Sequence, residues 1–77
     1  MAKVLFKGWS YGLGKISLTK LFQQKANLSF KDAKGETDAL LIDKTFVIEI
    51  KDISQAEELV REATAIGAVC EIIKKND

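Results

Sequence analysis

The stretch "SQAEELVREATAIG", residues 54–67, predicts a helix with both ends marked. Ser54 is the expected N-cap, Glu57 completes a capping box, and Gly67 stops the helix. Apolar residues recur between them at helical steps: Ala56, Leu59, Val60, Ala63 and Ile66. The segments on either side, "FVIEI" at 46–50 and "AVCEII" at 68–73, are typical of strands. A crossover through one helix makes these two strands parallel.

The segment upstream of this unit adds one strand and two helices. "KVLFK" at 3–7 alternates as a strand, and helical patterns cover 15–26 and 29–41, with Asn27 as a left-handed stop between them. Three strands with one apolar face each and three helices with one apolar stripe each can bury these apolar surfaces against one another only in two layers. We therefore expect an α+β sandwich in the order strand, helix, helix, strand, helix, strand, with three helices on one face of a three-stranded sheet. Placing the first strand centrally gives it antiparallel neighbours on both sides.

Periodicity also predicts which side chains of the first two helices are buried. The inward stripe of the first helix consists of Leu18, Leu21, Phe22 and the stem of Lys25. The second helix is expected to begin at a Ser29 N-cap with Asp32 three residues on. Its expected buried positions are Phe30, Ala33, Thr37, Leu40 and Leu41.

Composition limits the class of protein. Seventy-seven residues form a single domain, 1–77, whose ends at 1–2 and 74–77 are expected to fray. One cysteine and no histidine exclude an internal disulfide and the usual zinc and acid-base chemistry, and Cys70 is expected to pack as a strand residue. A three-residue apolar run at the N-terminus is too short for a signal peptide or a membrane span, so we expect a cytoplasmic protein and no membrane partner.

The loop "GWSYGLGK", residues 8–15, invites comparison with a phosphate cradle. The two outer glycines are separated by five residues instead of four, and Ile16 stands where a magnesium-binding hydroxyl is needed. The dinucleotide fingerprint fails on spacing as well. We expect a structural turn with Trp9 or Tyr11 folding over the edge of the core. Aromatic rings beside lysines leave stacking on single-stranded nucleic acid open as an alternative.

No carboxylate pair predicts catalysis. Asp32 is expected near a helix cap, and the other acidic residues of the helices follow surface spacing, so we expect neither an enzyme nor a cofactor.

The outer face of the first helix is the most informative surface. With Leu18 inward, steps of about 100° per residue place Ile16, Thr19, Lys20 and Gln23 outward. Residues 3–34 carry seven lysines and one acidic residue, whereas the rest of the chain sums to a net charge of −5. An exposed aliphatic residue flanked by Lys15 and Lys20, with Lys31 and Lys34 on the next helix, predicts a docking surface for an acidic protein.

Three segments, "GKISLTKLF", "ANLSFKDAK" and "ISQAEELVREATAIGAVCEI", resemble, in order, the C-terminal domain of the bacterial ribosomal stalk protein seven/twelve. The resemblance extends from Lys3 to Ile73. It implies a non-enzymatic domain that docks translational GTPases through its first two helices. Carried over by position, the implied contacts are Lys15, Ile16, Thr19 and Lys20 on the first helix, with Lys31 and Lys34 on the second.

This chain departs from the family at several positions. Gln23 stands for an arginine, Asn27 and Ser29 replace glycines, and the chain shows no dimerising N-terminal segment or alanine-rich hinge. We therefore expect a stand-alone relative of the stalk protein, whose oligomeric state the sequence leaves open. A Clp protease adaptor has a related fold, which leaves an adaptor unrelated to the ribosome as an alternative.

Overall fold

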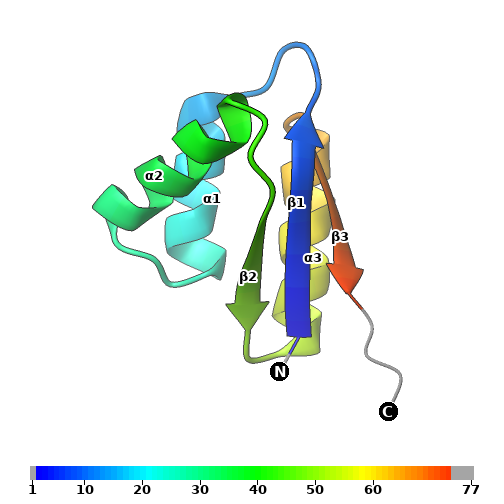
Figure 1. The fold of residues 1–77 in the computed structure, drawn as a ribbon. Coiled ribbons are helices and arrows are strands. Elements are labelled where there is room, and N and C mark those ends of the chain that lie inside the picture. Colours follow the sequence, from blue (N-terminus) through cyan, green and yellow to red (C-terminus); the bar gives the residue numbers. More distant parts are fainter. Residues whose placement is uncertain (1, 74–77) are drawn as a thin grey trace.

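The computed structural model describes residues 2–73 and has the predicted order of elements. These are β1 (Ala2–Trp9), α1 (Lys15–Lys25), α2 (Phe30–Leu41), β2 (Phe46–Ile50), α3 (Ile53–Ala65) and β3 (Ala68–Ile73) (Figure 1). The α+β class is therefore confirmed. Ala2 belongs to β1, opposite Ile50, where fraying was expected. The expected fraying of residues 1 and 74–77 lies outside the described residues.

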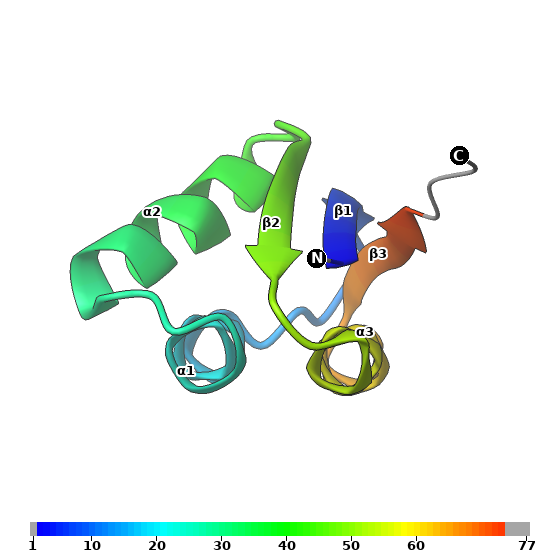
Figure 2. The same cartoon turned by 90° about the horizontal axis from the view of Figure 1, so that it is seen from below.

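The sheet has the order β2-β1-β3, with β1 central and antiparallel to both neighbours, as predicted. Consequently β2 and β3 run in the same direction. The register of β1 against β3 shifts between Phe6 and Gly8, which marks a bulge in β1. Figure 2 shows α1 and α3 side by side on one face of the sheet. In the same view, α2 packs beside α1, at the edge of the sheet that β2 forms. Among residues 2–73, no helix covers the opposite face of the sheet.

The core lies between the sheet and the helices. It comprises Val4, Phe6, Leu18, Leu21, Phe22, Ala33, Leu40, Ile48, Ile50, Ala56, Leu59, Ala63 and Ala68. An aromatic cluster joins the two layers: Phe6 of β1 stacks on Phe46 with ring centroids 5.2 Å apart and meets Phe22 of α1 edge-on at 5.1 Å. The inward stripe predicted for α1 is thus confirmed at Leu18, Leu21 and Phe22.

Local hydrogen bonds set the helix ends. Asn27 has the predicted left-handed conformation, with φ of 58°, and Ser29 Oγ accepts a hydrogen bond from the Asp32 N–H at 3.1 Å. The cap predicted for α3 is wrong. Asp52 is the N-cap, and its Oδ1 accepts a hydrogen bond from the N–H of Ser54 at 3.0 Å, which places Ser54 inside the first turn.

The β1–α1 loop does not cover the core with its aromatic residues, contrary to expectation. Tyr11 is fully exposed and Trp9 is partly exposed, whereas Leu13 packs against the core. A turn closed by a 3.2 Å hydrogen bond from the Leu13 N–H to the Ser10 carbonyl carries Tyr11 outward. Leu13 lies close to Gly67, where an added Cβ would sit only 2.9 Å from the Leu13 Cα.

Cys70 packs against the core from β3, as predicted. Burial raises the pKa of its thiol, and its Sγ lies 3.9 Å from the Thr64 hydroxyl oxygen.

Within residues 2–73, every helix is too short or too polar to cross a lipid bilayer.

Candidate functional site

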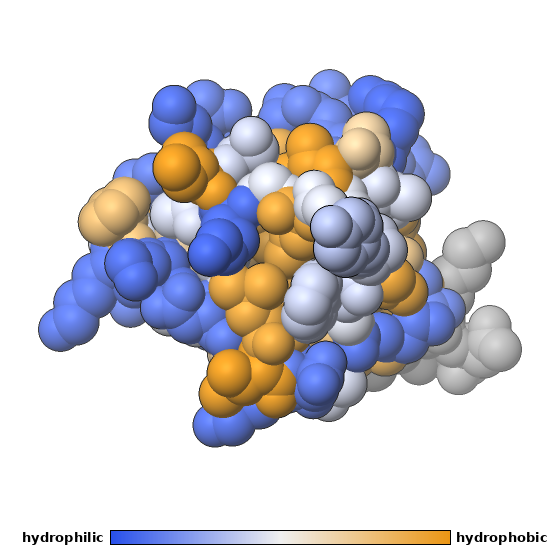
Figure 3. Space-filling model, turned by 90° about the horizontal axis from the view of Figure 1, so that it is seen from above, coloured by the Kyte–Doolittle hydropathy of each residue, from blue (hydrophilic) through white to orange (hydrophobic). Residues whose placement is uncertain are grey.

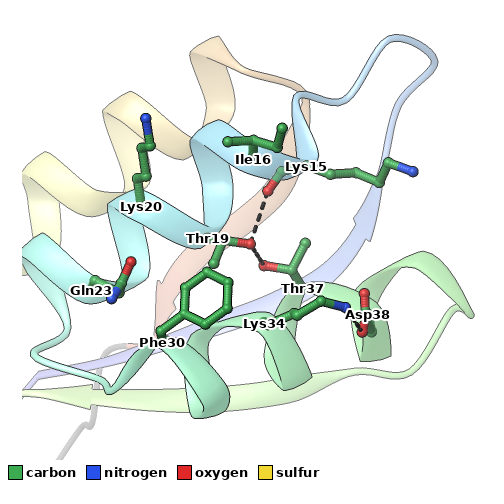
Figure 4. Close-up of a pocket in the computed structure, with 9 residues that line it drawn as sticks. All are labelled: Lys15, Ile16, Thr19, Lys20, Gln23, Phe30, Lys34, Thr37 and Asp38. Carbon is green, nitrogen blue, oxygen red and sulfur yellow. Dashed lines mark hydrogen bonds and ion pairs between the residues drawn. The ribbon is translucent and has the colours of Figure 1, made fainter.

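A groove of about 470 Å³ runs between α1 and α2 (Figure 4). Nine residues line it: Lys15, Ile16, Thr19, Lys20 and Gln23 from α1, and Phe30, Lys34, Thr37 and Asp38 from α2.

The floor of the groove is a buried pair of hydroxyls. Thr19 Oγ1 lies 3.0 Å from Thr37 Oγ1, and each hydroxyl also lies 3.0 Å from the carbonyl oxygen four residues earlier in its own helix. No buried side-chain nitrogen or oxygen among the described residues lacks a hydrogen-bond partner. The floor is therefore polar but internally satisfied.

The walls carry two exposed hydrophobic side chains. Ile16 of α1 is 75% exposed, as predicted, and Phe30 of α2 is 60% exposed. In Figure 4 the Phe30 ring points from the start of α2 toward α1, near Thr19 and Gln23. Neither side chain serves the core, so the apolar area of both remains in contact with water.

The rim of the groove has a positive balance. Lys34 Nζ is engaged by Asp38 Oδ2 at 3.1 Å, one helical turn away. Lys15 and Lys20 have no ion pair with any acidic residue of the part that the structure describes. These two ammonium groups flank Ile16 in sequence, and both remain available to a partner.

The structure gathers most of the residues predicted for the docking surface. Six of the seven, Lys15, Ile16, Thr19, Lys20, Gln23 and Lys34, line the groove, whereas Lys31 is exposed on α2 but is not part of the lining. Thr19 was expected on the outer face and is instead buried, at 8% exposure, because α2 packs against that side of α1.

Phe30, Thr37 and Asp38 line the groove but were not among the predicted site residues. Phe30 was expected in the core, yet it is the first residue of α2 and lies beyond the edge of the core. The prediction that Leu41 is buried is only partly correct, because this side chain is half-buried. Lys34 and Asp38 could have been placed beside Phe30, since the three recur at four-residue steps on one helix face.

Three backbone donors of the β1–α1 loop are already engaged within the fold. The N–H groups of Ser10 and Gly14 donate to the carbonyls of Gly67 and Ile66, at 2.8 and 3.0 Å, and the Leu13 N–H donates to Ser10. A phosphate cradle requires such N–H groups to be free. The loop therefore acts as a brace between β1 and the α3–β3 turn.

No family model matches this chain, and no curated protein does so either.

Across residues 2–73, no three His, Cys, Asp or Glu side chains gather closely enough to hold a metal ion together.

Proposed function

We propose that this protein is a non-enzymatic binding module that docks an acidic protein partner in the α1–α2 groove. The observation that carries the proposal is the combination of two exposed apolar side chains on facing walls, Ile16 and Phe30, with two lysines on the rim that form no ion pair among residues 2–73. The apolar walls supply the area that association buries, and the lysines select the charge of the partner.

The chemistry of the groove defines the partner. An apolar side chain of the partner fits between Ile16 and Phe30, above the threonine floor. Carboxylates on either side of it reach Lys15 and Lys20. A basic partner is disfavoured, because like charges would face one another across the contact.

The resemblance to the ribosomal stalk domain supports a translational GTPase as this partner, and a cytoplasmic location with it. In that family the docking surface lies on the two helices that correspond to α1 and α2. Gln23 supplies no positive charge where the family has an arginine, so electrostatic attraction here depends on Lys15 and Lys20.

The test is a calorimetric titration, in which the heat of binding is measured as a purified translational elongation GTPase is added to the purified protein. We expect Ile16→Ala combined with Lys20→Glu to abolish measurable binding. Both side chains are exposed, so the melting temperature is expected to remain close to that of the wild type.

A matched control makes the same two kinds of change away from the groove: Val47→Ala on the open sheet face with Lys51→Glu after β2. This variant has the same net charge as the groove variant and is expected to bind like the wild type. Absence of wild-type binding, or equal binding by the groove variant and the wild type, would contradict the proposed function.

A further inference from the structure

The β1–α1 loop is fixed at both ends. Gly67 accepts two hydrogen bonds from Ser10, one from the backbone N–H at 2.8 Å and one from the side-chain hydroxyl at 3.1 Å. The Gly14 N–H donates to the Ile66 carbonyl at 3.0 Å. Leu13 packs closely on Gly67 between these two points. The loop is therefore held against the α3–β3 turn over most of its length.

Tyr11 occupies the tip of this loop and has no part in the core. It is the second residue of the turn from Ser10 to Leu13, and Gly12 follows with φ of +90°, the sign that a type II turn requires at its third residue. The Tyr11 ring is fully exposed. A large ring presented by a fixed turn loses little backbone freedom on binding, which is a property of aromatic anchors in protein interfaces.

The loop continues directly into the groove. Gly14 is the N-cap of α1, and the next two residues, Lys15 and Ile16, line the groove. Ile42, at the end of α2, is also exposed at this end of the molecule. Figure 3 looks down on this end and shows hydrophobic surface (orange) between hydrophilic flanks (blue).

We propose that Tyr11 is a second anchor of the docking surface, contacted by the same acidic protein partner that occupies the α1–α2 groove. This inference rests on the proposed function. The partner passes over Lys15, whose ammonium group pairs with one of the partner's carboxylates, and the partner's apolar surface covers the Tyr11 ring. A protein is favoured over single-stranded nucleic acid because neither the loop nor α1 contains an arginine; the one arginine of the chain is Arg61 of α3.

The test measures the affinity of three variants for the same purified elongation GTPase. Tyr11→Ser removes the ring and is expected to weaken binding about tenfold or more. Tyr11→Phe retains the ring and is expected to stay within about twofold of the wild type. Ile53→Ser removes an exposed apolar side chain at the opposite end of the molecule, at the start of α3, and is expected to bind normally (Figure 1).

The outcomes separate this inference from the proposed function. Wild-type binding that Tyr11→Ser leaves unchanged would overturn the role of Tyr11 and leave the groove proposal standing. No wild-type binding would overturn both. The fluorescence of Trp9, the one tryptophan of the chain, reports on the loop. Quenching of Trp9 by a single-stranded oligonucleotide that disappears in Tyr11→Ser would assign the loop to unpaired bases and overturn the protein contact.

Discussion

Thr19 Oγ1 lies 3.0 Å from Thr37 Oγ1, and this contact joins α1 to α2 beneath the groove. Each hydroxyl has one proton. One of the two donates across the interface, and the other donates to the carbonyl four residues earlier in its own helix, that of Lys15 or Ala33. Either direction satisfies both groups, so the pair holds the two walls of the groove together without a buried unsatisfied donor.

This relationship predicts non-additive stability effects. Thr19→Val and Thr37→Val should each lower the free energy of unfolding by about 1 kcal/mol, because each removes one interhelical hydrogen bond. The double variant should cost about as much as one single variant, since replacing both partners leaves no hydroxyl without its contact. Urea denaturation of the four proteins measures the coupling. If the loss of unfolding free energy in the double variant equals the sum of the two single losses, the hydroxyls act independently and the predicted coupling is wrong.

Gly67 should be intolerant of a side chain, unlike Gly35. Its φ of +108° disfavours any Cβ, and that atom would press on the Leu13 backbone. We expect Gly67→Ala to destabilise the fold by about 2 kcal/mol or more. Gly35 lies within α2 with no atom near its missing Cβ, so Gly35→Ala should stabilise by up to about 1 kcal/mol. Thermal denaturation of the two variants tests this difference. Equal changes in melting temperature would contradict a close contact between Gly67 and the β1–α1 loop.

Glu36 should make stability depend on pH. Burial raises the pKa of this carboxyl, and repulsion from Asp32 one turn earlier raises it further. The folded state thus favours the neutral form, and this contribution to stability is lost as pH rises through the raised value. Glu36→Gln should therefore raise the melting temperature near about pH 7, and the gain should vanish near about pH 3, where the glutamic acid is neutral in both states. A gain of the same size at both pH values would contradict this assignment.

The cap of α3 can be tested by a pair of alanine substitutions. Asp52→Ala removes the carboxylate that accepts the Ser54 N–H and should cost about 1 kcal/mol. Ser54→Ala changes a residue inside the first turn and should cost less than about 0.5 kcal/mol. The reverse order, measured by denaturation, would restore Ser54 as the cap.

The order of elements was predictable because each helix and strand of this chain has its own local signal. The bounds of β2 and β3 and the central place of β1 agree with the prediction. Local signals also compete: Asp52 and Ser54 are both good caps, and a pattern of residue types alone does not decide between them. The structure resolves this in favour of Asp52, because α3 begins one residue after it.

Side-chain burial was less predictable where a helix has two neighbours. The periodic pattern treats α1 as packing against one core, which places Thr19 outward, but α2 covers that side as well. Phe30 was assigned to the core by its place in the helical series of α2, but it is the first residue of the helix and is 60% exposed, whereas Ala33, three residues on, is buried. Ile16 was placed correctly, because none of the described helices and strands buries its side chain, which is 75% exposed. The shape of the groove therefore could not be predicted from local sequence patterns, because it depends on how α1 packs against α2.

The central claim is that the α1–α2 groove is the docking surface, and amide resonances measured by nuclear magnetic resonance test it most directly. Isotope-labelled protein is titrated with the purified translational elongation GTPase. We predict that shifts and line broadening concentrate on Ile16, Lys20, Phe30 and Lys34, while the open sheet face around Val47 stays unchanged. Perturbations centred on the sheet face, or none at saturating partner, would contradict the claim.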